Sequence, residues 1–201
     1  MAIPIESLPP PGWDREGIDG LLGLFPPGRL SEIVGPRSSG GSSLLLAFIA
    51  RITASGGQVA FVDATDALDP ASATTAGADL SALLWVKCAG RLRVALSAAD
   101  LLVRCPGFAL VVLDLDELGP VPASAQIRLQ RAVEGSDTIL VVRSARHREG
   151  SGASLVLTTR RLEPRWMGVR PLTRLGGLRS EVSITRSRLP GEGTWTLDWT
   201  L

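Results

Sequence analysis

Lysine and histidine are almost absent from this chain of 201 residues, which contains one of each, Lys87 and His147. A single histidine excludes catalytic and metal sites that are built from several imidazoles. The two cysteines, Cys88 and Cys105, lack the spacing of metal ligands, so we expect both to be buried thiols. We therefore predict neither a metal site nor catalysis that depends on histidine.

Long apolar runs are also missing. No stretch approaches the roughly 20 apolar residues of a membrane span, and the N-terminus has no basic segment followed by an apolar one. We therefore expect a cytoplasmic protein with no membrane partner. Apolar residues make up 45 % of the sequence, which is enough to form the core of one domain of this length.

The most informative motif is a phosphate-binding loop without its lysine, at residues 35–43 (GPRSSGGSS). In the pattern G-x-x-x-x-G-K-[ST], backbone N–H groups cradle phosphates and the lysine reaches the terminal ones. Gly35 and Gly40 keep the spacing and Ser42 keeps the hydroxyl of a magnesium ligand, but Gly41 occupies the lysine position. A charge-assisted hydrogen bond is worth roughly 1.5–3 kcal/mol, so this loss should weaken phosphate binding by about one to two powers of ten.

Hydrophobic periodicity places this loop between a strand and a helix. Strands are predicted at 28–34, 58–63, 83–87, 108–114 and 138–142, and helices at 42–53, 91–104 and 122–134. From residue 154 the pattern changes to alternating runs, at 155–161, 181–186 and 194–200. We expect an α/β fold with a mainly parallel sheet that is flanked by helices and completed by antiparallel C-terminal strands.

Three segments of the chain resemble the bacterial recombinase RecA. They are the strand and loop at 28–40, AFVDATDALDP at 60–70 and AGADLSALL at 76–84. The resemblance extends over roughly residues 17–118 and implies a RecA-like P-loop NTPase core. Nucleotide would then bind at a degenerate site formed by Gly35, Gly40, Gly41, Ser42 and Asp114, where Asp114 matches the carboxylate linked to magnesium.

The resemblance also reveals a second chemical loss. In RecA an aspartate-alanine pair is followed by a glutamate that activates water, whereas here Asp63-Ala64 is followed by Thr65. A threonine cannot act as a general base near neutral pH. We therefore predict no ATP hydrolysis and no bound cofactor, and we expect Gly41→Lys to tighten nucleotide binding without restoring turnover. Alternatively, Asp114 and Asp63 are structural residues that cap a strand and a turn.

We predict two segments, an extended proline-rich arm over residues 1–16 and a single truncated RecA-like core domain over residues 17–201. Ile3, Ile5 and Leu8 of the arm are candidate partner contacts, because fixed proline dihedrals reduce the entropy lost on docking. A further candidate is Trp166, which the sequence places in an irregular segment between two other large side chains. Tryptophan is enriched at interface hot spots.

Charge is distributed unevenly along the chain. Residues 1–121 carry eight basic and thirteen acidic side chains, whereas residues 122–188 carry thirteen arginines and five acids. Arg143, Arg146 and Arg148 are assigned to the loop after the last parallel strand, where RecA contacts single-stranded DNA. We expect these arginines either to bind DNA weakly and without sequence preference or to form a solvated face that balances the acidic half.

A RecA-like chain of this length with these losses is similar to ImuA, an accessory protein of the bacterial SOS mutasome. That similarity implies a catalytically inactive adaptor in DNA-damage tolerance and translesion mutagenesis. Its partners would be ImuB, an error-prone DnaE-type polymerase, RecA and, weakly, DNA. Two alternatives stay open: a recombinase-type, DNA-dependent ATPase that a partner completes, and a regulator similar to an SOS-induced cell-division inhibitor.

Overall fold

The structure, a computed structural model, describes residues 15–116, 118–119, 121–146, 152–169, 172–188 and 193–200. Within these residues the sheet has eight strands in the order β3-β2-β4-β5-β1-β6-β7-β8. The strands are β1 (Leu30–Val34), β2 (Gln58–Asp63), β3 (Leu83–Lys87), β4 (Phe108–Asp116), β5 (Ile139–Ser144), β6 (Leu155–Val169), β7 (Leu172–Ser187) and β8 (Thr194–Thr200). Pairing is parallel from β3 to β6 and antiparallel from β6 to β8, as predicted.

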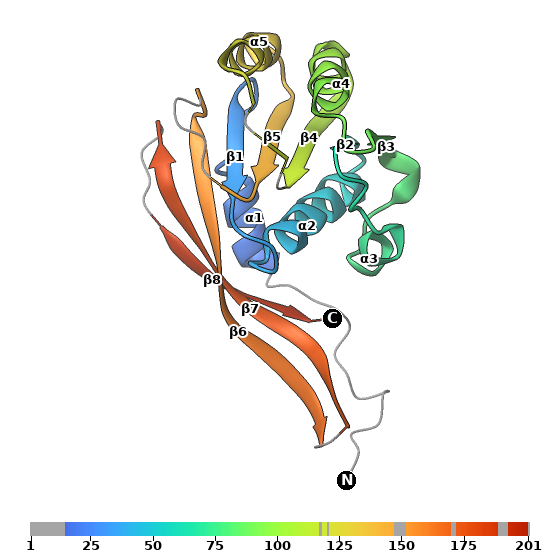
Figure 1. Cartoon of the computed structure of the whole chain (residues 1–201), viewed down its shortest axis with the longest axis vertical. Helices are drawn as coiled ribbons and strands as arrows, with labels where there is room; N and C mark the ends of the chain where they lie inside the picture. Colours follow the sequence, from blue (N-terminus) through green and yellow to red (C-terminus); the bar gives the residue numbers. More distant parts are fainter. Residues whose placement is uncertain are drawn as a thin grey trace.

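Helices cover both faces of the parallel part of the sheet (Figure 1). On one face lie α1 (Arg15–Leu22), α2 (Gly41–Ala54) and α3 (Pro70–Thr75), and on the other lie α4 (Leu92–Arg104) and α5 (Ala123–Val133). A short 3₁₀ helix, η2 (Leu80–Ala82), leads into β3. None of the helices in the described part of the chain combines the length and the apolar character that a bilayer span requires.

The central strands are apolar on both sides because each side faces a helical layer. Successive residues of β4 alternate between two apolar clusters: Leu110 and Val112 join the cluster of α1 and α2, whereas Val111 and Leu113 join that of α4 and α5. This alternation is the two-residue period of a strand. The sheet therefore separates two apolar cores. The loop that leads into α2 lies at the carboxyl ends of its parallel strands.

The predicted helix positions are confirmed, since α2, α4 and α5 each begin and end within a residue of the predicted bounds. Sequence periodicity missed α1 and α3, which are eight and six residues long. α1 begins at Arg15, inside the predicted arm, and anchors the chain through the fully buried Ile18 and Leu21. Residues 1–14, including Ile3, Ile5 and Leu8, lie outside the described residues.

β6 and β7 form a hairpin that is far longer than predicted, with strands of 15 and 16 residues. β1 pairs with β6 only as far as Thr158, and β8 pairs with β7 only from Gly177 onward. The far end of the hairpin is thus a two-stranded ribbon that extends away from the helical layers (Figure 1). Register shifts along the β6–β7 pairing break the strict alternation of side chains, so the sequence pattern underestimated both strands.

Candidate nucleotide site and its ion network

The loop between β1 and α2 lies at the carboxyl end of the parallel strands, as the sequence predicted. Gly40 precedes α2 with φ of 95°, in the left-handed region that favours glycine. Gly41 is the first residue of the helix and is buried, whereas Ser42, the candidate magnesium ligand, is exposed. The strand–loop–helix arrangement is therefore present, although the lysine that would carry the positive charge is missing.

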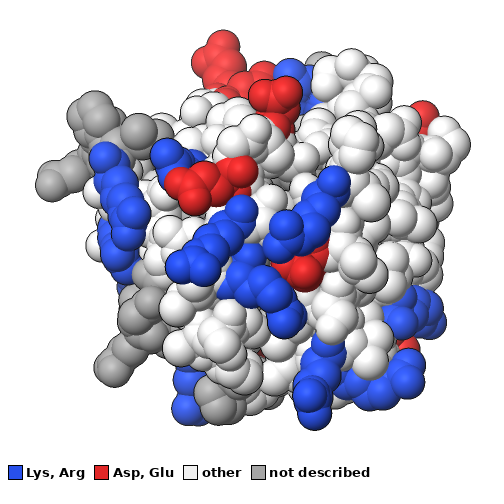
Figure 2. All heavy atoms as spheres, turned by 90° about the horizontal axis from the view of Figure 1, so that it is seen from above, with Lys and Arg blue, Asp and Glu red and all other residues white. Residues whose placement is uncertain are grey.

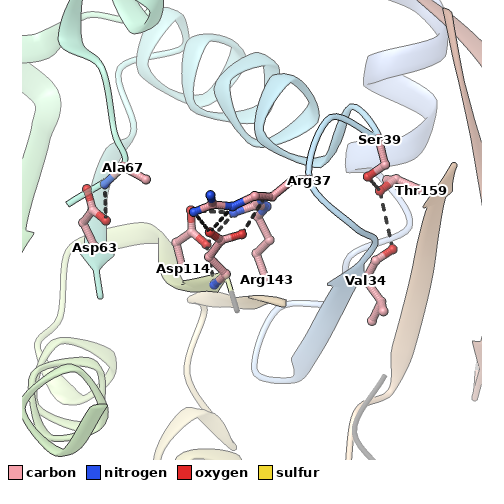
Figure 3. Close-up of polar contacts among 9 residues, drawn as sticks. Val34, Arg37, Ser39, Asp63, Ala67, Asp114, Arg143 and Thr159 are labelled. Atoms are coloured by element: carbon pink, nitrogen blue, oxygen red, sulfur yellow. Dashed lines mark hydrogen bonds and ion pairs between the residues drawn. The ribbon is translucent and has the colours of Figure 1, made fainter. Parts of the chain in front are cut away.

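Packing against the C-terminal strands explains why both loop glycines are present. A Cβ atom on Gly35 would overlap the hydroxyl of Thr159 on β6, and one on Gly40 would overlap the hydroxyl of Ser180 on β7. The loop is also tied to β6 by a 2.6 Å hydrogen bond between the Ser39 and Thr159 hydroxyls (Figure 3). These glycines are required by the close approach of three segments, whether or not a phosphate binds.

Arg143 supplies the buried cation of the site. It lies in β5, is only 6 % exposed, and its Nη1 donates to Asp114 Oδ1 at 2.8 Å and to Oδ2 at 3.1 Å (Figure 3). Its Nη2 lies 3.4 Å from Asp116 Oδ1. The assignment of Arg143 to a DNA-binding loop is therefore corrected, because its guanidinium is buried inside the protein.

The parallel register of β4 and β5 brings these charges together. Asp114 and Arg143 are direct partners in the pairing of the two strands. Asp116 follows Asp114 by two residues and lies close to the same guanidinium, and the Asp116 carboxylate also accepts hydrogen bonds from Arg37. The sequence contains a signal for this pair, because Asp114 and Arg143, which are opposite in charge, each directly follow an apolar run in their strands.

Gly41 and Arg143 are close neighbours. A Cβ atom on Gly41 would lie 3.4 Å from Arg143 Nε, in van der Waals contact, so a side chain at this position would begin directly beside the arginine. Arg37 completes the network from the loop, with Nη2 and Nε at 2.7 Å and 3.0 Å from Asp116 Oδ2. Two arginines and two aspartates thus form a cluster whose formal charges cancel.

Burial raises the pKa of Asp114, while the charge and hydrogen bonds of Arg143 act in the opposite direction. Asp114 Oδ1 also accepts a hydrogen bond from the backbone N–H of Asp116 at 3.2 Å. A magnesium ion would therefore have to compete with Arg143 for the same carboxylate oxygens. The alternative that Asp114 is a structural residue agrees with these contacts.

Asp63 has a structural role in the turn after β2. Its Oδ1 accepts from the Ala67 N–H at 3.0 Å, and its Oδ2 accepts from the Leu68 N–H at 2.9 Å and from Trp85 Nε1 at 3.1 Å. This outcome confirms the interpretation of Asp63 as a turn residue. Thr65 follows in the same turn, and its hydroxyl has no hydrogen-bond partner within the described ranges.

The remaining candidate residues are dispersed. Arg146 is exposed just after β5, and Arg148 lies outside the described residues. Trp166 belongs to β6, which corrects its assignment to an irregular segment, and its side chain is 63 % exposed. Leu175 of β7 lies opposite Trp166 in the register and is 43 % exposed. The structure therefore does not join the arginines and Trp166 into one site.

The parallel sheet between two helical layers and the loop before α2 define a RecA-like α/β domain. Residues 15–130 match the family model of the RecA N-terminal domain, and the chain belongs to this family. Protein RecA of Nocardioides sp. is 42% identical over 116 residues, which are 57% of this chain and 32% of that protein. Protein RecA of Clavibacter michiganensis is 47% identical over 93 residues, 46% of this chain and 25% of that protein. The match to Protein RecA of Borrelia hermsii likewise covers only 26% of that relative.

Removal of the Arg143 cation should destabilise the protein. In Arg143→Met, the buried carboxylates of Asp114 and Asp116 lose their shared partner, so the free energy of unfolding should fall by about 3–5 kcal/mol near neutral pH. Burial already raises the pKa of Asp114, and loss of the cation raises it further. The deficit should therefore shrink as the pH falls and the carboxyl groups take up protons.

Urea unfolding followed by circular dichroism at several pH values would measure this effect. Arg146→Met is the matched control, because Arg146 is exposed, and its free energy of unfolding should change by less than about 0.5 kcal/mol. Equal stability of Arg143→Met and the original protein would show that the ion network makes no net contribution to folding.

The geometry reverses the expectation for Gly41→Lys. The new side chain would lie beside Arg143 Nε and add a third cation to the cluster of two arginines and two aspartates. We now expect this variant to lose stability and to bind a fluorescent ADP analogue with magnesium no better than the original protein. The double variant Gly41→Lys/Arg143→Gln keeps two cations beside the two aspartates and should bind the analogue more tightly than either single variant. Tenfold tighter binding by Gly41→Lys alone would contradict the inferred position of Arg143.

Proposed function

We propose that this protein is a RecA-like adaptor that acts without nucleotide hydrolysis. The supporting observation is the ion network, in which Arg143 lies beside Gly41 and is already paired with Asp114 and Asp116. A polyphosphate gains less from a cation that is paired with buried carboxylates than from an unpaired lysine. Thr65 adds to this argument, because a hydroxyl cannot replace the carboxylate that would activate water.

The resemblance to ImuA extends the proposal to the bacterial SOS response. In this role the protein is an accessory factor of DNA-damage tolerance and translesion mutagenesis, with ImuB, an error-prone DnaE-type polymerase and RecA as partners. Membership of the RecA N-terminal domain family makes RecA the first partner to test.

The far end of the β6–β7 hairpin is the partner surface that we assign. Trp166 and Leu175 are opposite each other in the antiparallel register, so their side chains lie on the same face of the ribbon. Both are largely exposed, and no β8 residue pairs with this part of β7 among the described residues. An exposed tryptophan beside a leucine is typical of an interface hot spot. Ile3, Ile5 and Leu8 remain predicted contacts of the arm.

Partner binding should be independent of nucleotide. Immobilised protein should retain RecA or ImuB equally well with ATP, with ADP and without nucleotide. Trp166→Ala should weaken retention by at least about tenfold, as expected for a hot-spot tryptophan. Leu84→Ala is the matched control, because Leu84 is 45 % exposed on β3, at the opposite edge of the sheet.

The same assay separates the adaptor from the alternatives. Retention that requires ATP, or DNA-stimulated ATP hydrolysis that Asp114→Ala abolishes, would support a recombinase-type ATPase. Retention of neither RecA nor ImuB would remove the mutasome role and favour the regulator similar to a cell-division inhibitor.

We also propose that Arg146 and Arg148 bind DNA weakly. The supporting observation is that Arg146 is exposed just after β5. Arg146→Ala/Arg148→Ala should reduce the slope of log affinity against log salt by about 0.7 for each lost phosphate contact with a single strand. Titration of a labelled oligonucleotide at several salt concentrations measures the slope. The control is Arg51→Ala. Arg51 is a surface arginine of α2 that pairs with Asp19 of α1, on the helical layer opposite α4 and α5. An unchanged slope would assign the two arginines to a solvated face.

A further inference from the structure

The outer face of α4 and α5 combines arginines with exposed aliphatic side chains. Figure 2 looks down on the side of the molecule where these two helices lie and shows basic side chains gathered over its centre. Six residues form what we call the α4–α5 patch: Arg93, Leu101 and Arg104 of α4, and Ile127, Arg128 and Arg131 of α5. Leu101 is 65 % exposed and Ile127 is 50 % exposed.

The two aliphatic residues of the patch, Leu101 and Ile127, do not contribute to the buried core. α4 packs against the sheet through Ala95, Leu96, Ala99 and Val103, and α5 packs through Ala125, Leu129, Ala132 and Val133. Helical spacing directs Leu101 and Ile127 away from these buried positions. A single exposed leucine is ordinary, but here two aliphatic side chains lie on neighbouring helices among four arginines.

Asp100 holds the two helices of the patch in a fixed relation. Its Oδ1 lies 3.2 Å from Arg104 Nη2 on the same helix and 3.6 Å from Arg128 Nε on α5. The patch is therefore preformed, which reduces the entropy lost when a partner binds.

The patch is strongly positive. Asp100 is the one acidic residue of α4 and α5, against the four arginines of the patch, so the two helices carry a net charge of plus three. Within the part of the chain that the structure describes, neither Arg93 nor Arg131 makes a salt bridge. These two guanidinium groups are available to carboxylates of another molecule.

We propose that the α4–α5 patch binds an acidic segment of a partner protein that also carries aliphatic side chains. Leu101 and Ile127 form the apolar centre of this interface, and the four arginines form a rim that pairs with carboxylates. Nucleic acid fits the patch less well, because aliphatic side chains offer no surface for base stacking and Asp100 places a carboxylate among the arginines. The patch lies on the helical layer opposite α2, so this proposal is independent of the nucleotide site.

The test uses a defined peptide and the full-length protein. The probe is a fluorescein-labelled amphipathic peptide in which leucines recur every three or four residues and glutamates fill the other positions. Fluorescence anisotropy at low salt should show saturable binding. Arg128→Glu/Arg131→Glu and, separately, Leu101→Ser/Ile127→Ser should each weaken binding by about tenfold or more.

Controls separate a specific patch from general attraction between charges. Arg160→Glu/Arg161→Glu makes the same charge change at exposed positions of the β6–β7 hairpin, away from its far end, and should leave peptide affinity within about twofold, because these residues lie outside the patch. A peptide with lysine in place of glutamate should not bind, and one with serine in place of leucine should bind weakly. Urea midpoints of the variants should match that of the original protein.

Three results would overturn the proposal. The first is an absence of saturable binding of the acidic peptide. The second is an equal loss of affinity in the hairpin control, which would show that only net charge matters. The third is binding of an oligothymidine, without binding of the peptide, that the patch variants abolish. This result would make the patch a nucleic-acid surface.

Discussion

The ion pair between Arg143 and Asp114 is the interaction on which the centre of this structure depends. It joins β4 to β5 at the end of the sheet where the loop before α2 also lies, and Asp116 and Arg37 extend it to that loop. A buried guanidinium and buried carboxylates are tolerated only because each compensates the other. The register of β4 and β5, the position of the loop and the charge of the site are therefore coupled.

This coupling provides a structural explanation for the glycine-rich loop before α2. The lysine position is not simply vacant, because a cation from the sheet lies beside it and is paired with both acids. The loop glycines also admit Thr159 and Ser180, which belong to strands far along the chain. A glycine pattern that resembles a phosphate site can thus persist for reasons of packing, since close approach of backbone to side chains requires glycine in either case.

The two surfaces that we propose for partner binding lie at the periphery of the described structure. The ribbon with Trp166 and Leu175 and the arginine-rich face of α4 and α5 are separate surfaces of one domain. The first carries an exposed tryptophan and leucine, whereas the second combines exposed aliphatic side chains with arginines. The chain matches the RecA N-terminal domain family over residues 15–130, and its aligned region covers between a quarter and a third of the RecA relatives described above.

Local sequence patterns determined the α/β layout and the bounds of α2, α4 and α5, and residue identities alone carried the predictions that rest on Gly41 and Thr65. These features depend on residue identity and on periodicity over a few residues. Tertiary structure alone decided that Arg143 is a buried partner of Asp114 and that the hairpin reaches Val169 and Leu172. The first depends on the register of strands nearly thirty residues apart in sequence. The second depends on register shifts that break the two-residue alternation, which a sequence pattern cannot reveal.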